Sequence, residues 1–210
     1  VTLVEACRAC HDVAVELAAP FVSGKDSLNN VFAWTDASGR HRELSIPPTL
    51  LATALGQVDD VHRVVTPDLK AVGDRLAIVG VSRDELAGSQ LELTGRVHGG
   101  HVPRVDAALC RHTFEAVAAA IRAGLVTACH DCSDGGLAAA VAEMAIGGGL
   151  AARIRLADVP LVTGAGGDPA TAAGRSAPLA RDVCVAFTET PGRFVCAAVS
   201  YTHLTLPTKA

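Results

Sequence analysis

The stretch Pro20–Asn30 constrains this chain most, because an apolar run ends there in a cluster of small and polar residues. Five consecutive positions supply a flexible backbone, a cation, a carboxylate and two hydroxyls: Ser23, Gly24, Lys25, Asp26 and Ser27. Glycine, aspartate, serine and asparagine are ordinary turn residues, so a loop is expected here. The same side chains suit a phosphate that is bound together with a divalent metal ion.

Residue types alone leave two interpretations of this loop open. A P-loop is excluded, because it needs a glycine five residues before the Gly of Gly-Lys and a Ser or Thr after the lysine. Those positions hold Ala19 and Asp26. From the residue types alone, a short strand at 21–22 that runs into a plain turn is favoured over a phosphate and metal site, because short motifs often occur without the function.

Charge and hydrophobicity exclude several classes of protein. The net charge of −4 gives no basic face for nucleic acid. No apolar run reaches about 18 residues, so no membrane span is expected. The first 20 residues are interrupted by charged side chains, which excludes a signal peptide and predicts a cytoplasmic protein. The chain does not begin with Met, which predicts that it is a fragment.

Along the chain, segments with the apolar spacing of a helix are interspersed with segments that have the apolar pattern of a strand. Half of the 210 residues are hydrophobic. This predicts a mixed α+β or α/β fold. Helices are expected over 4–18, 106–123 and 137–145, with a helix start at 82–86. Strands are expected over 31–34, 49–58, 75–81, 126–129, 151–156, 183–187 and 193–198, and a loop over 164–178. A break near residues 68–73 predicts two domains, over 1–67 and 73–198.

Four of the seven cysteines form two Cys-x-x-Cys pairs, Cys7 with Cys10 and Cys129 with Cys132. Zinc ribbons separate such pairs by about 15 to 20 residues, whereas more than a hundred residues separate these. Small buried thiols in a reducing compartment explain them better than a zinc or redox site. A second imaginable metal set, made of His98, His101 and His112, has no carboxylate beside it, so these are expected to be surface residues.

A second polar loop lies at 130–137, between an expected strand and an expected helix. Ser133 or Asp134 can cap that helix, and Gly135 and Gly136 allow backbone amides to face an anion. A plain helix cap needs only one or two of these residues, so their density favours a functional loop.

Five segments, in order and spacing, resemble the second half of the phosphoribosylformylglycinamidine synthase family over about residues 1–198. They are Pro-Phe-Val-Ser-Gly-Lys-Asp-Ser-Leu-Asn-Asn at 20–30, Ile-Pro-Pro-Thr-Leu-Leu at 46–51, Val-Thr-Pro-Asp-Leu-Lys at 65–70, Val-Pro-Arg-Val-Asp at 102–106 and His-Asp-Cys-Ser-Asp-Gly-Gly-Leu at 130–137. The resemblance implies the end of an aminoimidazole-ribonucleotide-synthetase-like N-terminal domain, followed by a truncated C-terminal α/β domain.

The resemblance also implies an activity and its ligands. The family converts formylglycinamide ribonucleotide to its amidine, using ATP, Mg²⁺ and ammonia that a glutaminase domain or subunit releases from glutamine. By position, Gly24, Lys25 and Ser27 are expected to bind nucleotide or phosphate, and Asp26 to bind the metal. Asp131 matches a metal-binding aspartate of the family's first half. The catalytic residues belong to that first half, so no catalytic residue is expected here and the chain alone is expected to be inactive.

Residues 200–210 do not resemble the family and are interpreted as a non-native tail. Two other functions stay open. Aminoimidazole ribonucleotide synthetase and selenophosphate synthetase share the fold and the use of ATP, although their motifs differ from Ser-Gly-Lys-Asp-Ser. A non-catalytic nucleotide-binding module is the second alternative.

Overall fold

The computed structural model describes residues 2–97, 100–162 and 180–198. The chain divides into two compact units, Val1–Asp59 (unit 1) and Asp60–Ala210 (unit 2), which are described separately. The expected division into domains 1–67 and 73–198 stays a prediction. The expected loop over 164–178 and the tail over 200–210 lie outside the described residues.

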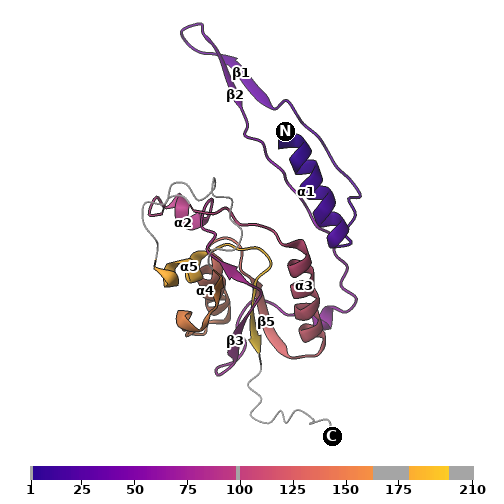
Figure 1. Ribbon diagram of the computed structural model, residues 1–210, viewed down its shortest axis with the longest axis vertical. Coiled ribbons are helices and arrows are strands. Elements are labelled where there is room, and N and C mark those ends of the chain that lie inside the picture. Colours follow the sequence, from indigo (N-terminus) through magenta and orange to yellow (C-terminus); the bar gives the residue numbers. More distant parts are fainter. Residues whose placement is uncertain (1, 98–99, 163–179, 199–210) are drawn as a thin grey trace. The chain divides into compact units, whose positions relative to one another are not determined.

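Unit 1 consists of one helix and one hairpin (Figure 1). Helix α1 spans Thr2–Glu16, which confirms the helix expected from the sequence. Strands β1 (Val31–Thr35) and β2 (His41–Ser45) pair antiparallel, with Val31 opposite Ser45. The Asp36 carboxylate holds the turn between them, because it accepts hydrogen bonds from the Ser38 amide at 2.9 Å and from the Arg42 side chain at 2.8 Å.

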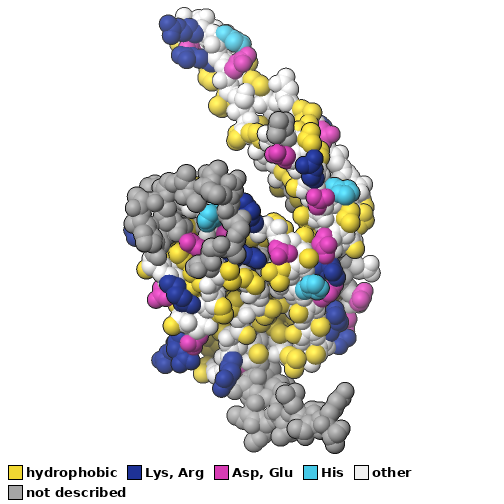
Figure 2. All heavy atoms as spheres, in the orientation of Figure 1, with side chains coloured by type: hydrophobic (Ala, Val, Ile, Leu, Met, Phe, Trp, Pro, Cys, Tyr) yellow, Lys and Arg dark blue, Asp and Glu magenta, His cyan; other side chains and the backbone are white. Residues whose placement is uncertain are grey.

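None of the described residues of unit 1 is buried. The ring centroids of Phe32 and Trp34 lie 5.5 Å apart on β1, and both rings remain exposed. Figure 2 shows hydrophobic side chains on the surface of this unit. The strands expected at 21–22 and 49–58 are wrong, since both segments are irregular and exposed. A strand needs a hydrogen-bonding neighbour, and no described residue provides one for either segment.

Unit 2 is built on a three-stranded antiparallel sheet. Its strands are β3 (Arg75–Val79), β7 (Phe194–Ala198) and β5 (Val126–Asp131), in the order β3-β7-β5. The central strand β7 is buried along most of its length. Two short strands, β4 (Ser82–Arg83) and β6 (Leu161–Val162), form a separate parallel pair. The mixed helix and sheet content confirms the expected fold class.

Two helices cover opposite faces of the sheet (Figure 1). Helix α3 (Ala107–Arg122) confirms the helix expected over 106–123. Its N-cap is Asp106, whose carboxylate accepts a hydrogen bond from the Leu109 amide at 3.0 Å. Helix α4 (Gly136–Gly148) packs its Leu137, Val141 and Met144 against the other face. The shorter helices are α2 (Gln90–Leu93), α5 (Arg181–Phe187) and the 3-10 turns η1 (Val61–Arg63) and η2 (Leu156–Asp158).

Three sequence expectations for unit 2 are wrong. Residues 82–86 do not start a helix, because Ser82 and Arg83 pair with Leu161 and Val162 of β6, 79 residues further on in the chain. The strand expected over 151–156 is also wrong, since 151–155 are irregular and Leu156 begins the 3-10 turn η2. Residues 183–187 are part of helix α5 and not a strand, and a short apolar run of this length is compatible with either structure.

Candidate functional site

The 23–27 loop lies in unit 1 between α1 and β1, and all five of its residues are exposed. The Lys25 ammonium donates a hydrogen bond to the Ser27 hydroxyl at 3.2 Å and another to the Asp26 carbonyl. A cation and a hydroxyl therefore converge on one point. A side chain added at Gly24 would meet no atom within 4 Å, so the backbone there is open to a ligand.

This geometry suits a phosphate better than it suits a metal ion. Lys25 and Ser27 offer a positive charge and a hydroxyl donor to phosphate oxygens. Asp26 offers one carboxylate, and nowhere in the described residues do three or more His, Cys, Asp or Glu side chains gather as a metal site. Because Mg²⁺ keeps several waters and is often bound by one or two carboxylates plus phosphate oxygens, Asp26 fits as a single ligand that needs a phosphate beside it.

The 131–135 loop lies in unit 2, where β5 ends and α4 begins. Neither Ser133 nor Asp134 caps the helix: the N-cap is Gly135, with φ of 75° and no capping side chain of its own. The Glu189 carboxylate accepts a hydrogen bond from the Gly135 amide at 2.8 Å and another from the Gln90 amide at 2.9 Å. One carboxylate therefore accepts hydrogen bonds from backbone amides at the N-termini of both α4 and α2.

This arrangement changes the interpretation of the second loop. The sequence suggested that backbone amides at Gly135 and Gly136 face an anion. The structure supplies an anion from the protein itself to the Gly135 amide, whereas the Gly136 amide donates to the Ser133 carbonyl at 2.9 Å. Glu189 follows the loop by 54 positions, so no local sequence signal could identify it. Gly136 is required for packing, because its φ is 63° and an added Cβ would lie 2.4 Å from the Thr188 carbonyl oxygen.

Asp131 is exposed, and the ring of its neighbour His130 lies between the carboxylates of Asp131 and Glu143. The His130 ring lies 3.3 Å from the Asp131 carboxylate through Nδ1 and 2.9 Å from the Glu143 carboxylate through Nε2. The same Nδ1 lies 2.8 Å from the Asp131 carbonyl oxygen. Glu143, on α4, was not expected from the sequence. Asp131 is therefore available as a single oxygen ligand, held next to a histidine that bridges two carboxylates.

A cavity of about 390 Å³ opens beside this loop. Asp131, Ser133, Asp134 and Glu189 form its polar wall, and its apolar wall includes Phe114 and Phe194, which meet edge to face at 5.8 Å between centroids. The other residues that line this cavity are Pro103, Cys132, Pro191, Gly192 and Arg193. The cavity combines acidic side chains with an aromatic surface, as many small-molecule sites do.

Arg193 is one of the residues that line this cavity, and it is 1% exposed. Its guanidinium donates to the Ser82 hydroxyl at 2.9 Å, to the Thr190 carbonyl at 3.1 Å and to the Thr188 carbonyl. Burial lowers the pKa of Arg193 from its ordinary value, although a guanidinium keeps its proton at neutral pH. These contacts tie β4 to the 188–193 segment and so support the cavity wall.

Two thiols face each other on the sheet of unit 2. The sulfur atoms of Cys129 and Cys196 lie 3.7 Å apart. The hydrogen bond between them raises the pKa of Cys129 and lowers that of Cys196. Burial raises the pKa of Cys132 to about 11. Three of the four Cys-x-x-Cys thiols are half-buried or more, while Cys7 is exposed.

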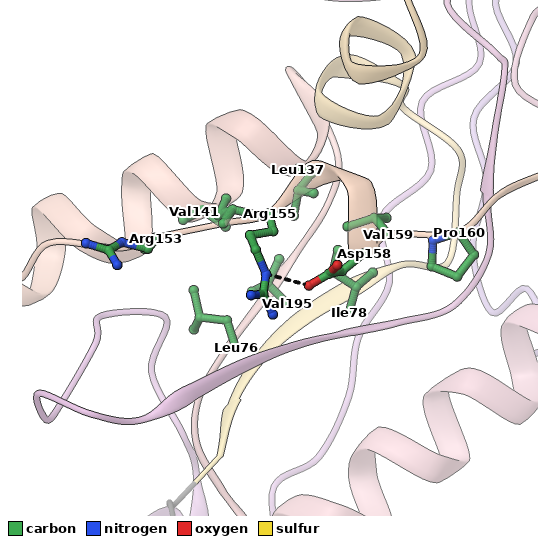
Figure 3. Close-up of a pocket in the computed structure, with 11 residues that line it drawn as sticks. Leu76, Ile78, Leu137, Val141, Arg153, Arg155, Asp158, Val159, Pro160 and Val195 are labelled. Carbon is green, nitrogen blue, oxygen red and sulfur yellow. Dashed lines mark hydrogen bonds and ion pairs between the residues drawn. The ribbon is translucent and has the colours of Figure 1, made fainter.

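A second cavity, of about 400 Å³, lies between β3, α4 and the 153–160 segment (Figure 3). Leu76 and Val195 from the sheet and Val141 from α4 give it an apolar lining. Arg155 and Asp158 form an ion pair of 2.7 Å at its border. None of the residues expected to bind nucleotide, phosphate or metal lines it.

Across the three described ranges, no helix combines the length and the apolarity of a membrane span. His101 and His112 belong to no metal cluster among the described residues, and His98 lies outside them. The expected site residues thus lie in two separate loops, Gly24 to Ser27 in unit 1 and Asp131 in unit 2.

Comparison with known proteins gives one family match and many curated relatives. The family model described as "AIR synthase related protein, C-terminal domain" matches residues 71–203. Phosphoribosylformylglycinamidine synthase subunit PurL of Thermococcus sibiricus is 32% identical over 194 residues, which is 92% of this chain and 24% of that protein. The PurL subunits of Leifsonia xyli (33% over 156 residues, 74% and 19%) and Anaeromyxobacter sp. (39% over 142 residues, 66% and 17%) are also similar.

The chain spans about a fifth of the length of these curated relatives. Among solved structures, PurLQS from Thermotoga maritima is similar with a TM-score of 0.49 and 17% identity, over 67% of this chain and 20% of that one.

Proposed function

The chain belongs to the AIR synthase related family through its C-terminal domain, and from this premise we propose that it is a segment of a phosphoribosylformylglycinamidine synthase. In this proposal the complete enzyme converts formylglycinamide ribonucleotide to the amidine in purine biosynthesis, in the cytoplasm. One observation carries the proposal: the similarity to a PurL subunit extends over 92% of the chain and so includes both units, not only the domain that the family model matches.

The proposed reaction replaces an amide oxygen by nitrogen. ATP supplies the phosphoryl group that turns this oxygen into a leaving group, ammonia from glutamine attacks the same carbon, and the oxygen departs with phosphate. Such chemistry depends mainly on positioning and on stabilisation of charge. The residues proposed here serve the binding of phosphate and metal, and no described residue is proposed as catalytic.

The 23–27 loop is the proposed nucleotide-binding element. Lys25 and Ser27 converge within 3.2 Å, which supports a role in holding phosphate oxygens. Gly24 leaves space for a phosphate to approach the backbone. Asp26 is proposed as a ligand of Mg²⁺ whose remaining ligands are phosphate oxygens and waters. Lys25 cannot be a metal ligand, because its ammonium group has no acceptor.

Asp131 is proposed as a second, weaker metal ligand. Its exposed carboxylate borders the 390 Å³ cavity, which supports access for an ion from solvent. His130 competes for the same carboxylate, because its Nδ1 lies 3.3 Å from it. The proposed partners of the chain are the remainder of the synthase, which would supply the catalytic residues, and a glutaminase domain or subunit. The chain alone is therefore expected to show no turnover.

The test is an assay of a complete synthase that carries this segment, with formylglycinamide ribonucleotide, ATP and either glutamine or ammonia. We expect amidine formation that depends on ATP and proceeds with ammonia even when glutamine hydrolysis is blocked. Absence of amidine with both nitrogen donors contradicts the proposal. Activity with formylglycinamidine ribonucleotide or selenide in place of the amide substrate would assign the segment to another synthetase of the superfamily.

A further inference from the structure

The register of the unit 2 sheet places Cys129 directly opposite Cys196. Residues opposite each other in an antiparallel pair have Cα atoms about 4.5 to 5.5 Å apart. Disulfides form across Cα separations of about 4.4 to 6.8 Å, so the backbone of this pair already meets the requirement for a bond. The sulfur atoms lie 3.7 Å apart, in contact but not bonded.

The two thiols share one face of the sheet, and the nearby Cys132 lies on the other. Cys129 and Cys196 pack in the cluster beneath α3, together with Val117. Cys132 packs with Ala128 in the cluster beneath α4. Because successive side chains of a strand point to opposite faces, the sheet itself separates Cys132 from the pair. Proximity in sequence would favour Cys129 with Cys132, whereas the fold favours Cys129 with Cys196.

The other Cys-x-x-Cys pair provides a contrast within the same chain. Cys7 and Cys10 lie three residues apart on α1, and Cys7 is exposed to solvent. Cβ atoms three residues apart on a helix are about 5 to 6 Å apart. A disulfide needs about 3.5 to 4.5 Å between Cβ atoms, so this pair cannot close while the helix is intact. Solvent exposure therefore favours oxidation at Cys7, whereas the geometry needed for a disulfide favours Cys129 with Cys196.

We propose that Cys129 and Cys196 are a redox modification site, which closes to a cross-strand disulfide when the protein meets a hydroperoxide. Two S–H bonds and the O–O bond of hydrogen peroxide break, and one S–S bond forms. The two sulfur atoms give up two electrons, the peroxide oxygens accept them, and both thiol protons end in the two water molecules produced. A dithiol reductant reverses the bond by thiol–disulfide exchange.

The partial exposure of Cys129 gives the oxidant a route to the pair, since Cys196 is only 4% exposed. The bond would link β5 to β7 two positions before Asp131, which pairs with Phe194 at the border of the 390 Å³ cavity. The modification therefore lies beside the 131–135 loop. It rests on the sheet register, the sulfur–sulfur distance and the shared face of the sheet, and it does not depend on the proposed synthase activity.

The experiment treats the native chain with hydrogen peroxide, blocks the remaining thiols with iodoacetamide and maps the peptides by mass spectrometry. Cleavage after Lys and Arg, combined with cleavage before Asp, separates Cys129 (in 123–130) from Cys132 (in 131–133) and Cys196 (from 194 onward). We expect a linked peptide that joins Cys129 to Cys196, a loss of two free thiols from the original seven, and recovery of both with dithiothreitol.

Variants and a denatured sample keep the outcome decisive. Cys129→Ser and Cys196→Ser should each abolish the linked peptide, while Cys132→Ser should retain it. Since the native chain is mapped first, the result stands even if a variant folds poorly. The proposal is overturned if Cys129 links to Cys132, if Cys7 and Cys10 close first, if no linked peptide forms, or if the link appears only in the urea-unfolded chain.

Discussion

Unit 1 and unit 2 each present a polar loop of similar composition, but different forces hold the two loops in place. Among the described residues, the 23–27 loop makes hydrogen bonds only within itself, and no described residue of its unit is buried. The 131–135 loop rests on Glu189, on the buried Arg193 and on a sheet that is packed on both faces. Side chains around the second loop should therefore determine stability, and those of the first should affect ligand binding alone.

The largest effect expected from this contrast is at Arg193. Arg193→Met introduces an apolar, unbranched side chain, and it leaves the Ser82 hydroxyl and the Thr188 and Thr190 carbonyls without the guanidinium donor. We expect a loss of about 4 kcal/mol in the free energy of unfolding, measured by urea titration. The control is Arg155→Met, whose side chain is 81% exposed, with a loss below about 0.5 kcal/mol. Equal effects of the two variants would contradict the difference in burial.

Two glycines at opposite ends of α4 compare a closely packed backbone position with an open one. Gly136 and Gly149 both have positive φ, but an added Cβ meets the Thr188 carbonyl only at Gly136. Gly136→Ala should lose about 3 kcal/mol in the free energy of unfolding, because backbone strain and a steric clash add together. Gly149→Ala should lose about 1 kcal/mol from strain alone. Equal losses in urea titration would show that the 131–135 loop is not closely packed against the 188 segment.

Glu189 tests whether one distant carboxylate holds two helix starts. Glu189→Ala removes the acceptor for the Gly135 and Gln90 amides and should cost about 1 to 2 kcal/mol in the free energy of unfolding. Glu189→Gln retains an acceptor oxygen and should cost about 0.5 kcal/mol. Hydrogen exchange at the two amides provides the local measurement. Exchange that stays unchanged in Glu189→Ala would exclude this capping role.

The smallest structural effect is expected in unit 1, at low pH. Hydrogen bonds from Ser38 and then Arg42 lower the pKa of Asp36 to about 2, from an ordinary 3.8. A lowered carboxyl pKa stabilises the turn above about pH 3.8, and this contribution is lost as the pH falls through about 2. Fluorescence of Trp34, the only tryptophan, should therefore stay constant from pH 7 to 4 and change near pH 2. A transition centred near pH 4 would show that the turn does not hold Asp36.

Periodicity predicted those elements whose signals are local. Helix α3 followed from its apolar spacing, and β3, β5 and β7 followed from apolar runs between breaks. The segment at 183–187 was assigned wrongly, because its five residues fit a strand or a buried helix equally well. The strand at β4 was missed because its partner, β6, lies far along the chain.

The candidate site could be predicted only in part, for a similar reason. The residues of the 23–27 loop are contiguous, so their convergence at Lys25 and Ser27 is visible in the sequence. The roles of Glu189, Arg193 and Glu143 are not, since each depends on tertiary contacts of residues that no local motif marks. The cap expected from Ser133 or Asp134 was wrong because Glu189 occupies that position from outside the loop.

The central claim is that the 23–27 loop is a phosphate and metal site and not a plain turn, and Asp26→Ala tests it most directly. In a complete synthase carrying this segment, we expect the Kd for Mg-ATP to rise about tenfold, since a charge-assisted contact contributes roughly 1 to 2 kcal/mol. The free energy of unfolding should change by less than about 0.5 kcal/mol, because Asp26 is exposed. An unchanged Kd for Mg-ATP would contradict the claim and leave the loop as a turn.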